Sequence, residues 1–255
     1  MTRALLIFLR CTDEDRNKET VLEKPTITDE TKELVKRLSV CYSGVVCDIL
    51  DELGIAGLMR GLRLQSSLPK GGKVVAPAIT VQFRKTVINR VQWDVHEAID
   101  IGEGHVLVID ADYKNGGSGS VVGGLMSTGA KVNGLLGTVV DGTCRDLEEI
   151  LKVDYPMYSR GVEPLTAVRR LMTTGLNVTI ECAGIVIRPG DIIFGDLDGV
   201  VCVPRDALKT VVEMAEKLFS KENTFEQDIK NGTPLVKVFS SLKSTEEMYH
   251  NKGPE

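Results

Sequence analysis

Residues 124–149 read GLMSTGAKVNGLLGTVVDGTCRDLEE. Within them the apolar residues are spaced first as in a helix and then as in a buried strand. The pattern predicts a short helix over 126–132 and a buried strand over 137–141. The strand is followed by Arg145 and Asp146, at the end of the strand where α/β sheets usually bind ligands. This pair is expected to open an acidic helix, and Asp146 and Glu149, three residues apart, are expected to share one face of it. A helix and a strand in such close succession indicate an α/β fold.

The rest of the chain fits the same class. Thr28, followed by Asp29 and Glu30, predicts the start of a helix. Further helices are expected over 43–53, near 93–101 and from Asp206, and further strands over 79–83, 105–110, 178–182, 185–188, 191–194 and 200–203. The strand over 79–83 is expected to be half-buried, and Pro189-Gly190 to form a tight turn. Beyond Lys221 the chain is polar, which predicts an arm or a frayed tail.

Composition excludes several classes of protein. The 255 residues carry a formal charge of −5 with mixed charges, which argues against nucleic acid as the main partner. The six cysteines and three histidines lack zinc-site spacing, so free thiols in a reducing compartment are expected. The apolar run over 4–9 is too short to span a membrane, and no longer run follows. We therefore expect a cytoplasmic, soluble protein without a membrane partner.

A binding site is indicated by two features, the glycine-rich stretch over 115–124 and the Arg145-Asp146 pair. Open backbone N–H groups can bind an anion, a guanidinium can clamp a carboxylate, and a carboxylate can hold a hard divalent cation. The loop lacks the fingerprint of a dinucleotide site and the Gly-Lys-Ser/Thr of a phosphate-binding P-loop. These groups together suit a small oxoacid bound to a metal ion.

The spacing resembles that of the RraA-like family, which contains ribonuclease E activity regulators, 4-hydroxy-4-methyl-2-oxoglutarate aldolases and oxaloacetate decarboxylases. The matching pattern is Gly124, twenty residues, Arg145-Asp146, two residues and Glu149. A second similar block runs over 184–204, and a weaker one over 43–51. The resemblance covers roughly residues 28–220. It implies a layered α/β/α sandwich of the swivelling-domain type, with extensions over 1–27 and 221–255.

The resemblance also implies roles for individual residues. Gly123, Gly124, Leu125 and Met126 would contact substrate through their backbone, and Arg145 would clamp its carboxylate or carbonyl group. Asp146 would be the catalytic metal ligand for Mg²⁺ or Mn²⁺, with Glu149 acting through a bound water. The implied activity is that of a metal-dependent aldolase and decarboxylase of 2-oxo acids. The implied assembly is a homotrimer or hexamer with sites between subunits.

Position 124 differs from the dedicated aldolases, in which the resemblance places an Asp. The absence of this carboxylate is expected to weaken aldol cleavage more than decarboxylation, because only aldol cleavage must deprotonate a hydroxyl group. The general base cannot be assigned from the sequence.

Other interpretations of the same residues remain open. The Arg145-Asp146 pair can be a surface ion pair or a helix N-cap, and the glycine-rich stretch a plain flexible loop. Cys144, beside Arg145, can be a reactive thiol but more often packs at a strand end. We interpret His96, His105, Asp48 and Asp51 as structural or solvated, and Asp196 and Asp198 as turn and interface residues. A non-catalytic regulator of ribonuclease activity is the alternative function.

Overall fold

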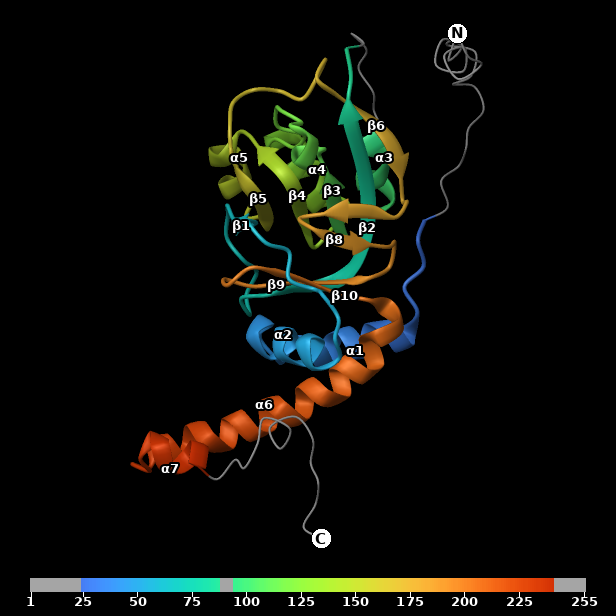
Figure 1. Cartoon of the computed structure of the whole chain (residues 1–255). Helices are drawn as coiled ribbons and strands as arrows, with labels where there is room; N and C mark the ends of the chain where they lie inside the picture. Colours follow the sequence, from blue (N-terminus) through green and yellow to red (C-terminus); the bar gives the residue numbers. More distant parts are fainter. Residues whose placement is uncertain (1–23, 88–93, 241–255) are drawn as a thin grey trace.

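The computed structural model describes residues 24–87 and 94–240 of the chain (Figure 1). Its helices are α1 (Asp29–Leu38), α2 (Ser43–Glu52), α3 (Asp94–Ile101), α4 (Gly124–Val132), α5 (Leu147–Lys152), α6 (Leu208–Lys230) and α7 (Leu235–Ser240). Its strands are β1 (Arg63–Leu64), β2 (Val74–Lys85), β3 (Val106–Asp110), β4 (Gly137–Cys144), β5 (Met157–Val162), β6 (Leu171–Leu176), β7 (Ile180–Cys182), β8 (Ile185–Ile187), β9 (Ile192–Gly195) and β10 (Val200–Val203). Two 3₁₀ helices are η3 (Tyr113–Asn115) and η4 (Arg205–Ala207).

Strand β2 is the centre of an eight-stranded sheet. The order is β1-β5-β4-β3-β2-β9-β10, and β6 also pairs with β2. Strands β2 to β5 are parallel, whereas β1, β6, β9 and β10 are antiparallel to their neighbours. The prediction of a mixed α/β fold is therefore confirmed.

The sheet curls until its two ends nearly meet. Leu58 forms an antiparallel bridge with Val201, and the amide N of Met59 donates to the carbonyl O of Val200 at 3.0 Å. The same segment leads into β1, which pairs with β5 at the other end of the sheet. The short β7–β8 hairpin contributes buried apolar residues to the interior.

Alternating side chains divide the protein into three apolar clusters. Along β2, Val75 packs in a cluster with α1, α2 and α6. Ala76 and Ala78 face the interior of the curled sheet. Ile79 and Val81 pack beneath α3, α4 and α5. Strand residues point to opposite faces in turn, so one curled sheet can serve an inner core and two outer ones. In Figure 1, α1, α2 and α6 lie below the sheet, and α3, α4 and α5 lie against its other part. This arrangement is the layered architecture implied by the family resemblance.

Two predicted helix starts are confirmed by their caps. The Thr28 side chain accepts the amide N–H of Thr31 at 3.1 Å, as an N-cap residue does. Helix α2 begins at Ser43, whose amide N and hydroxyl donate to the Asp196 carboxylate at 2.8 and 2.9 Å. Asp196 lies in the turn between β9 and β10, so its predicted turn role is confirmed and it also caps a helix.

Several elements differ from their predictions. The strand expected to be half-buried over 79–83 belongs to β2, which is buried on both faces because other strands and helices cover it. Strands β5 and β6 were not predicted. The arm beyond Lys221 is helical, since α6 continues to Lys230 and is followed by α7. Trp93 and the apolar run over 4–9 lie outside the described residues.

Candidate active site at the start of helix α4

The glycine-rich segment ends where α4 begins, beside the end of β4. Val122 bridges Cys144 in the parallel direction, and the amide N of Arg145 donates to the carbonyl O of Val122 at 3.0 Å. Gly123 is the N-cap residue of α4 and has no side chain with which to cap it. The first N–H groups of a helix lack partners within the helix. The start of α4 therefore presents free backbone donors next to Arg145 and Asp146.

Asp146 supplies the cap that Gly123 lacks. Its Oδ2 atom accepts the amide N–H of Gly124 at 3.3 Å and lies 3.6 Å from Nε of Arg145. Asp146 adopts φ 56° and ψ 43°, a left-handed conformation that Asp tolerates better than most residues. This conformation ends β4 and turns the carboxylate toward α4. A negative group at this position also suits the positive end of the helix dipole.

Both glycines lie in close contact with the residues that follow β4. A Cβ atom added to Gly123 would lie 2.6 Å from Oδ2 of Asp146 and 3.1 Å from Cγ of Arg145. A Cβ atom added to Gly124 would lie 2.6 Å from Cβ of Glu149. The Arg145, Asp146 and Glu149 side chains thus lie directly against the start of α4, and the structure brings together the residues that the sequence pattern selected.

Comparison with known proteins shows the family of the chain. The family model described as "RraA-like: Aldolase/RraA" matches residues 46–202. The chain belongs to the RraA-like family. Among its relatives, the Legionella pneumophila protein DlpA is 31% identical over 233 residues, or 88% of this chain and 36% of DlpA. A Halalkalibacterium halodurans protein named "Putative 4-hydroxy-4-methyl-2-oxoglutarate aldolase" is 31% identical over 194 residues, 76% of this chain and 87% of that protein.

A solved structure shares the fold of this RraA-like protein. Streptomyces coelicolor RraAS2, described as an unusual member of the RNase ES inhibitor RraA protein family, matches it with a TM-score of 0.68 at 29% identity. The match covers 81% of this chain and 98% of that chain. The family thus joins proteins named for aldolase activity and proteins named for inhibition of a ribonuclease.

The glycine-rich stretch of this RraA-like protein is fixed in place. The amide N of Ser120 donates to the carbonyl O of Leu165 at 2.7 Å, and the amide N of Ala167 donates back to Ser120 at 3.0 Å. Gly119 has φ +91°, and a Cβ atom there would lie 2.4 Å from the carbonyl O of Thr166. Around Gly119 and Ser120 the segment therefore runs as a strand-like ribbon along residues 163–167 rather than as a loop without contacts.

Helix α5 adds charges to the site. Its Lys152 Nζ lies 2.7 Å from Oε1 of Glu149 and 3.1 Å from Oε1 of Glu148. The hydrogen bond to Glu149, followed by that to Glu148, raises the pKa of Lys152. Asp146 precedes α5, so it and Glu149 do not share a helical face in the way the sequence predicted. Instead, both side chains lie against Gly124. Lys152 was missed, although its spacing from both glutamates indicates ion pairs.

The donor set fits a hard divalent cation. Asp146 and Glu149 offer carboxylate oxygens that are about half exposed, at 47% and 58% of their side chains. Mg²⁺ commonly binds through one or two carboxylates and retains several waters. Among the described residues there is no group of three or more His, Cys, Asp or Glu side chains arranged to hold an ion. Any metal here would therefore depend on one direct carboxylate together with water or substrate oxygens.

Leu125 and Met126 occupy the first turn of α4. The Leu125 side chain is 91% exposed, whereas Met126 packs partly against the core under α4. The first hydrogen bond of the helix is from the amide N of Ser127 to the carbonyl O of Gly123, at 3.0 Å. The N–H groups of residues 124–126 therefore precede the helical ladder, which is compatible with the predicted backbone contacts.

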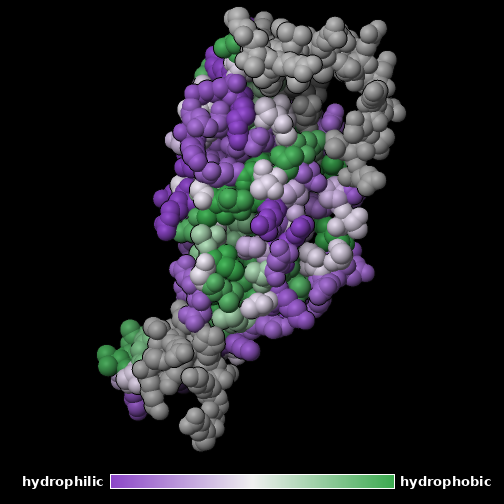
Figure 2. Space-filling model, turned by 45° about the vertical axis from the view of Figure 1, so that its right-hand side comes forward, coloured by the Kyte–Doolittle hydropathy of each residue, from purple (hydrophilic) through white to green (hydrophobic). Residues whose placement is uncertain are grey.

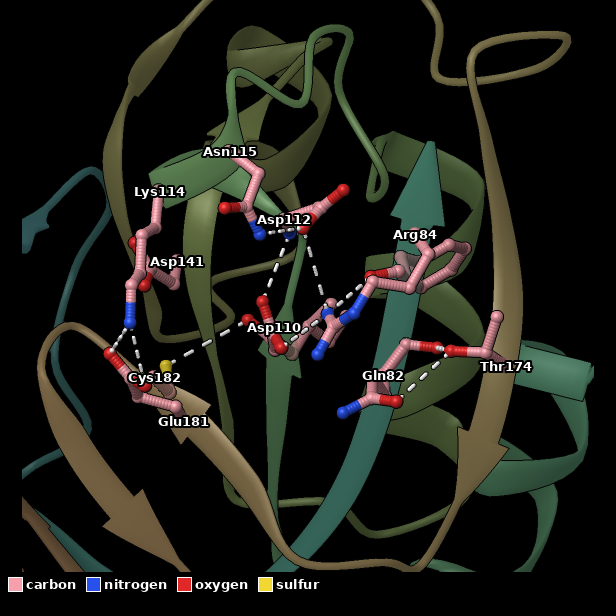
Figure 3. A network of polar contacts seen from close by, with 12 residues as sticks. Gln82, Arg84, Asp110, Asp112, Lys114, Asn115, Asp141, Thr174, Glu181 and Cys182 are labelled. Atoms are coloured by element: carbon pink, nitrogen blue, oxygen red, sulfur yellow. Dashed lines mark hydrogen bonds and ion pairs between the residues drawn. The ribbon is translucent and has the colours of Figure 1, made fainter. Parts of the chain in front are cut away.

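A second polar cluster lies at the carboxyl ends of β3 and β4 (Figure 3). Arg84 Nη1 lies 2.6 Å from Oδ2 of the buried Asp110 and 3.8 Å from Oδ1 of Asp112. Burial raises the pKa of Asp110, and the bond to Arg84 opposes this shift. Buried Asp141 pairs with Arg160 and accepts the amide N–H of Ala183 at 2.6 Å. These contacts fix η3 and the β7–β8 hairpin. The sequence signal that could have identified this cluster is a polar residue at the end of each buried strand.

Other candidate residues are structural. Burial raises the pKa of the Cys144 thiol, which lies 3.6 Å from Oγ of Ser159, so the packing interpretation is favoured over the reactive one. His105 is 2% exposed, and its Nδ1 lies 2.9 Å from the carbonyl O of Glu103. The amide N of Asp198 donates to Asp196 at 3.0 Å within their turn. These residues do not join the site at α4.

The surface is mixed in polarity. Figure 2 shows hydrophobic residues gathered across the middle of one face, with hydrophilic residues around them. The α6–α7 arm also carries exposed apolar side chains, including Leu235, Val236 and Phe239. In the described part of the chain, every helix is too short or too polar to cross a lipid bilayer.

Proposed function

We propose that this RraA-like protein is a divalent-metal-dependent carbon–carbon lyase of small 2-oxo acids. Its reactions would be cleavage of 4-hydroxy-4-methyl-2-oxoglutarate into two pyruvate molecules and decarboxylation of oxaloacetate to pyruvate and CO2. The observation that carries the proposal is the contact of Arg145 and Asp146 with the start of α4. The name of the Halalkalibacterium halodurans relative supports the same activity.

The geometry suits a 2-oxo acid because it provides donors of two kinds. The Arg145 guanidinium would bind the carboxylate or the 2-oxo oxygen, and the N–H groups of Leu125 and Met126 would donate to the oxygen that becomes negative. Both reactions pass through the enolate of pyruvate, so one set of donors serves both. Asp146 would hold Mg²⁺ or Mn²⁺, with Glu149 reaching the ion through water. The bound ion supplies a Lewis acid for the developing charge.

The decisive assay measures pyruvate release from oxaloacetate and from 4-hydroxy-4-methyl-2-oxoglutarate, with and without Mg²⁺ or Mn²⁺. Metal-dependent release from either substrate is expected. Failure with both substrates at every metal concentration would exclude the proposed lyase. The alternative, regulation of a ribonuclease by direct binding, predicts no turnover and a stable complex with that ribonuclease in the same preparation.

Asp146→Asn is expected to lower metal-dependent kcat/KM by more than roughly 100-fold, because it removes the direct carboxylate ligand. Asn still tolerates the left-handed backbone, so the fold should be retained. The matched control is Asp154→Asn, since Asp154 also has a left-handed backbone, at φ 49°, and follows the other end of α5. Full activity of Asp146→Asn at ordinary metal concentration would show that the metal is held elsewhere.

A further inference from the structure

A cavity of about 500 Å³ lies among the segment before α1, the first half of β2 and the beginning of α6 (Figure 1). We call it the α1–α6 cavity, and its polar lining includes Glu30, His105, Asn177 and Lys209. His105 directly precedes β3, whereas Arg145 directly follows β4, and the two strands are parallel. The cavity and the site at α4 therefore lie at opposite ends of these strands. Its volume is within the range of small-molecule binding sites.

Two polar side chains of the α1–α6 cavity have unused hydrogen-bonding groups. His105 is 2% exposed, and its Nδ1 lies 2.9 Å from the carbonyl O of Glu103. Because a carbonyl only accepts, Nδ1 carries the proton, and Nε2 of the neutral ring is an acceptor. Burial lowers the pKa of His105, which keeps the ring neutral at pH 7.

Within the described part of the chain, Nε2 of His105 has no hydrogen-bond partner. The Asn177 side chain also lacks one there, and its Oδ1 is buried. The Asn177 amide offers a donor at one end and an acceptor at the other, so it can serve a ligand group of either kind. Buried polar groups without partners are rare in proteins, and a bound molecule is one way to satisfy them.

The rest of the lining combines apolar walls with one unpaired charge of each sign. The walls include Pro77, Pro189 and Ile192. The exposed side chains of Glu30 and Lys209 form no ion pair with any residue that the structure describes. Asp206, which also lines the cavity, is different, because its Oδ2 lies 3.5 Å from Nη1 of Arg188. One acidic and one basic group therefore remain available for a ligand.

We propose that the α1–α6 cavity binds a small zwitterion of the amino-acid type, whose apolar side chain ends in an O–H or N–H group. The ammonium group would lie near Glu30, the carboxylate near Lys209, and the apolar body against the walls. A terminal hydroxyl fits the deepest groups best, because it can donate to Nε2 of His105 and accept from the Asn177 amide. The inference does not depend on the proposed lyase activity, since no lining residue belongs to the site at α4.

The ligand chemistry is tested by calorimetric titration of the full-length protein with three probes. L-tyrosine has all three features, L-phenylalanine lacks only the hydroxyl, and tyramine lacks only the carboxylate. L-tyrosine is expected to bind, and L-phenylalanine to bind about 10-fold more weakly, as for the loss of one hydrogen bond to buried groups. Tyramine should bind about 2- to 5-fold more weakly, as for the loss of one exposed ion pair. No heat of binding for L-tyrosine, or equal affinity for L-tyrosine and L-phenylalanine, would overturn the inference.

The location is tested by variants of the same protein. Asn177→Gly removes the amide and suits the left-handed backbone there, at φ 51°, and it should bring the affinities for L-tyrosine and L-phenylalanine within about twofold of each other. Lys209→Gln should weaken L-tyrosine binding by about 2- to 5-fold. Lys217→Gln is the matched control, because Lys217 is exposed on the same helix and does not line the cavity.

Both lysine variants alter exposed side chains and should fold, so the test holds even if Asn177→Gly does not. Equal losses of L-tyrosine affinity in Lys209→Gln and Lys217→Gln would indicate unspecific attraction to α6 and would overturn the inference. A folded Asn177→Gly protein that still prefers L-tyrosine by the wild-type factor would do the same.

Discussion

Asp146 combines a structural contact with its proposed chemical role. Its left-handed backbone directs Oδ2 to the amide N–H of Gly124, so the residue caps α4 from outside the helix. The cap restrains the carboxylate and leaves it about half exposed. Ligating carboxylates are commonly oriented by hydrogen bonds of this kind. The chain therefore uses a helix start to position the one direct ligand that we assign.

His105 gives a prediction about pH. Burial lowers its pKa below the ordinary value near 6.5, so the unfolded chain binds a proton at higher pH than the folded protein does. The free energy of unfolding should therefore fall as the pH drops below about 6.5, until the folded protein is also protonated. His105→Gln should show a smaller slope. Urea denaturation of both proteins between pH 5 and 8 measures the difference, and identical slopes would contradict the assignment.

The sequence predicted which residues form the candidate site but not how they meet. Arg145, Asp146 and Glu149 follow from the spacing pattern, and the structure places all three against the two glycines. The left-handed backbone of Asp146 was not predictable, because it depends on contacts with Gly123 and Gly124 more than twenty residues earlier. The close approach of Glu149 to Gly124, where an added Cβ atom would lie 2.6 Å from Cβ of Glu149, was not predictable for the same reason.

At the scale of elements, segments with a clear period of apolar residues were predicted from the sequence. Segments that are defined by their contacts with other strands were not. Strands β5 and β6 include Gly161 and Gly175 and have weak patterns, so their pairing with β4 and β2 defines them. Helix α6 extends past its apolar stripe because its second half contains good helix formers and an ion pair, with 2.7 Å between Lys230 Nζ and Glu226 Oε1. A sequence pattern identifies the buried half of such a helix and underestimates its length.

The two halves of the α6–α7 arm should differ in stability. Leu218→Ala in α6 should cost about 2–5 kcal/mol of unfolding free energy, because Leu218 is 1% exposed and packs in the apolar cluster with α1 and α2. Leu235→Ala in α7 should change it by less than about 0.5 kcal/mol, because Leu235 is 57% exposed. Chemical denaturation of both variants measures the contrast. Comparable losses would show that α7 is also packed against a partner surface.

At the scale of the whole molecule, we predict a homotrimer or a dimer of trimers. The family resemblance motivates this assembly, and the site at α4 offers few polar groups from one chain. Exposed apolar residues of α4, including Leu125 and Val132, would gain cover in an oligomer. Light scattering should give three or six times the 27.8 kDa of one chain. A monomer with full lyase activity would contradict the prediction.

The position of β2 has a consequence for synthesis on the ribosome. Val74 pairs with Gly195, which is 195 − 74 = 121 residues later, and β2 contributes to all three apolar clusters. The first half of the chain therefore leaves the ribosome with a central strand that lacks its neighbours on one side. Exposed strand edges promote aggregation, and long-range pairing slows folding. For this protein, the interval before β9 is translated is the period in which the nascent chain most needs protection by chaperones.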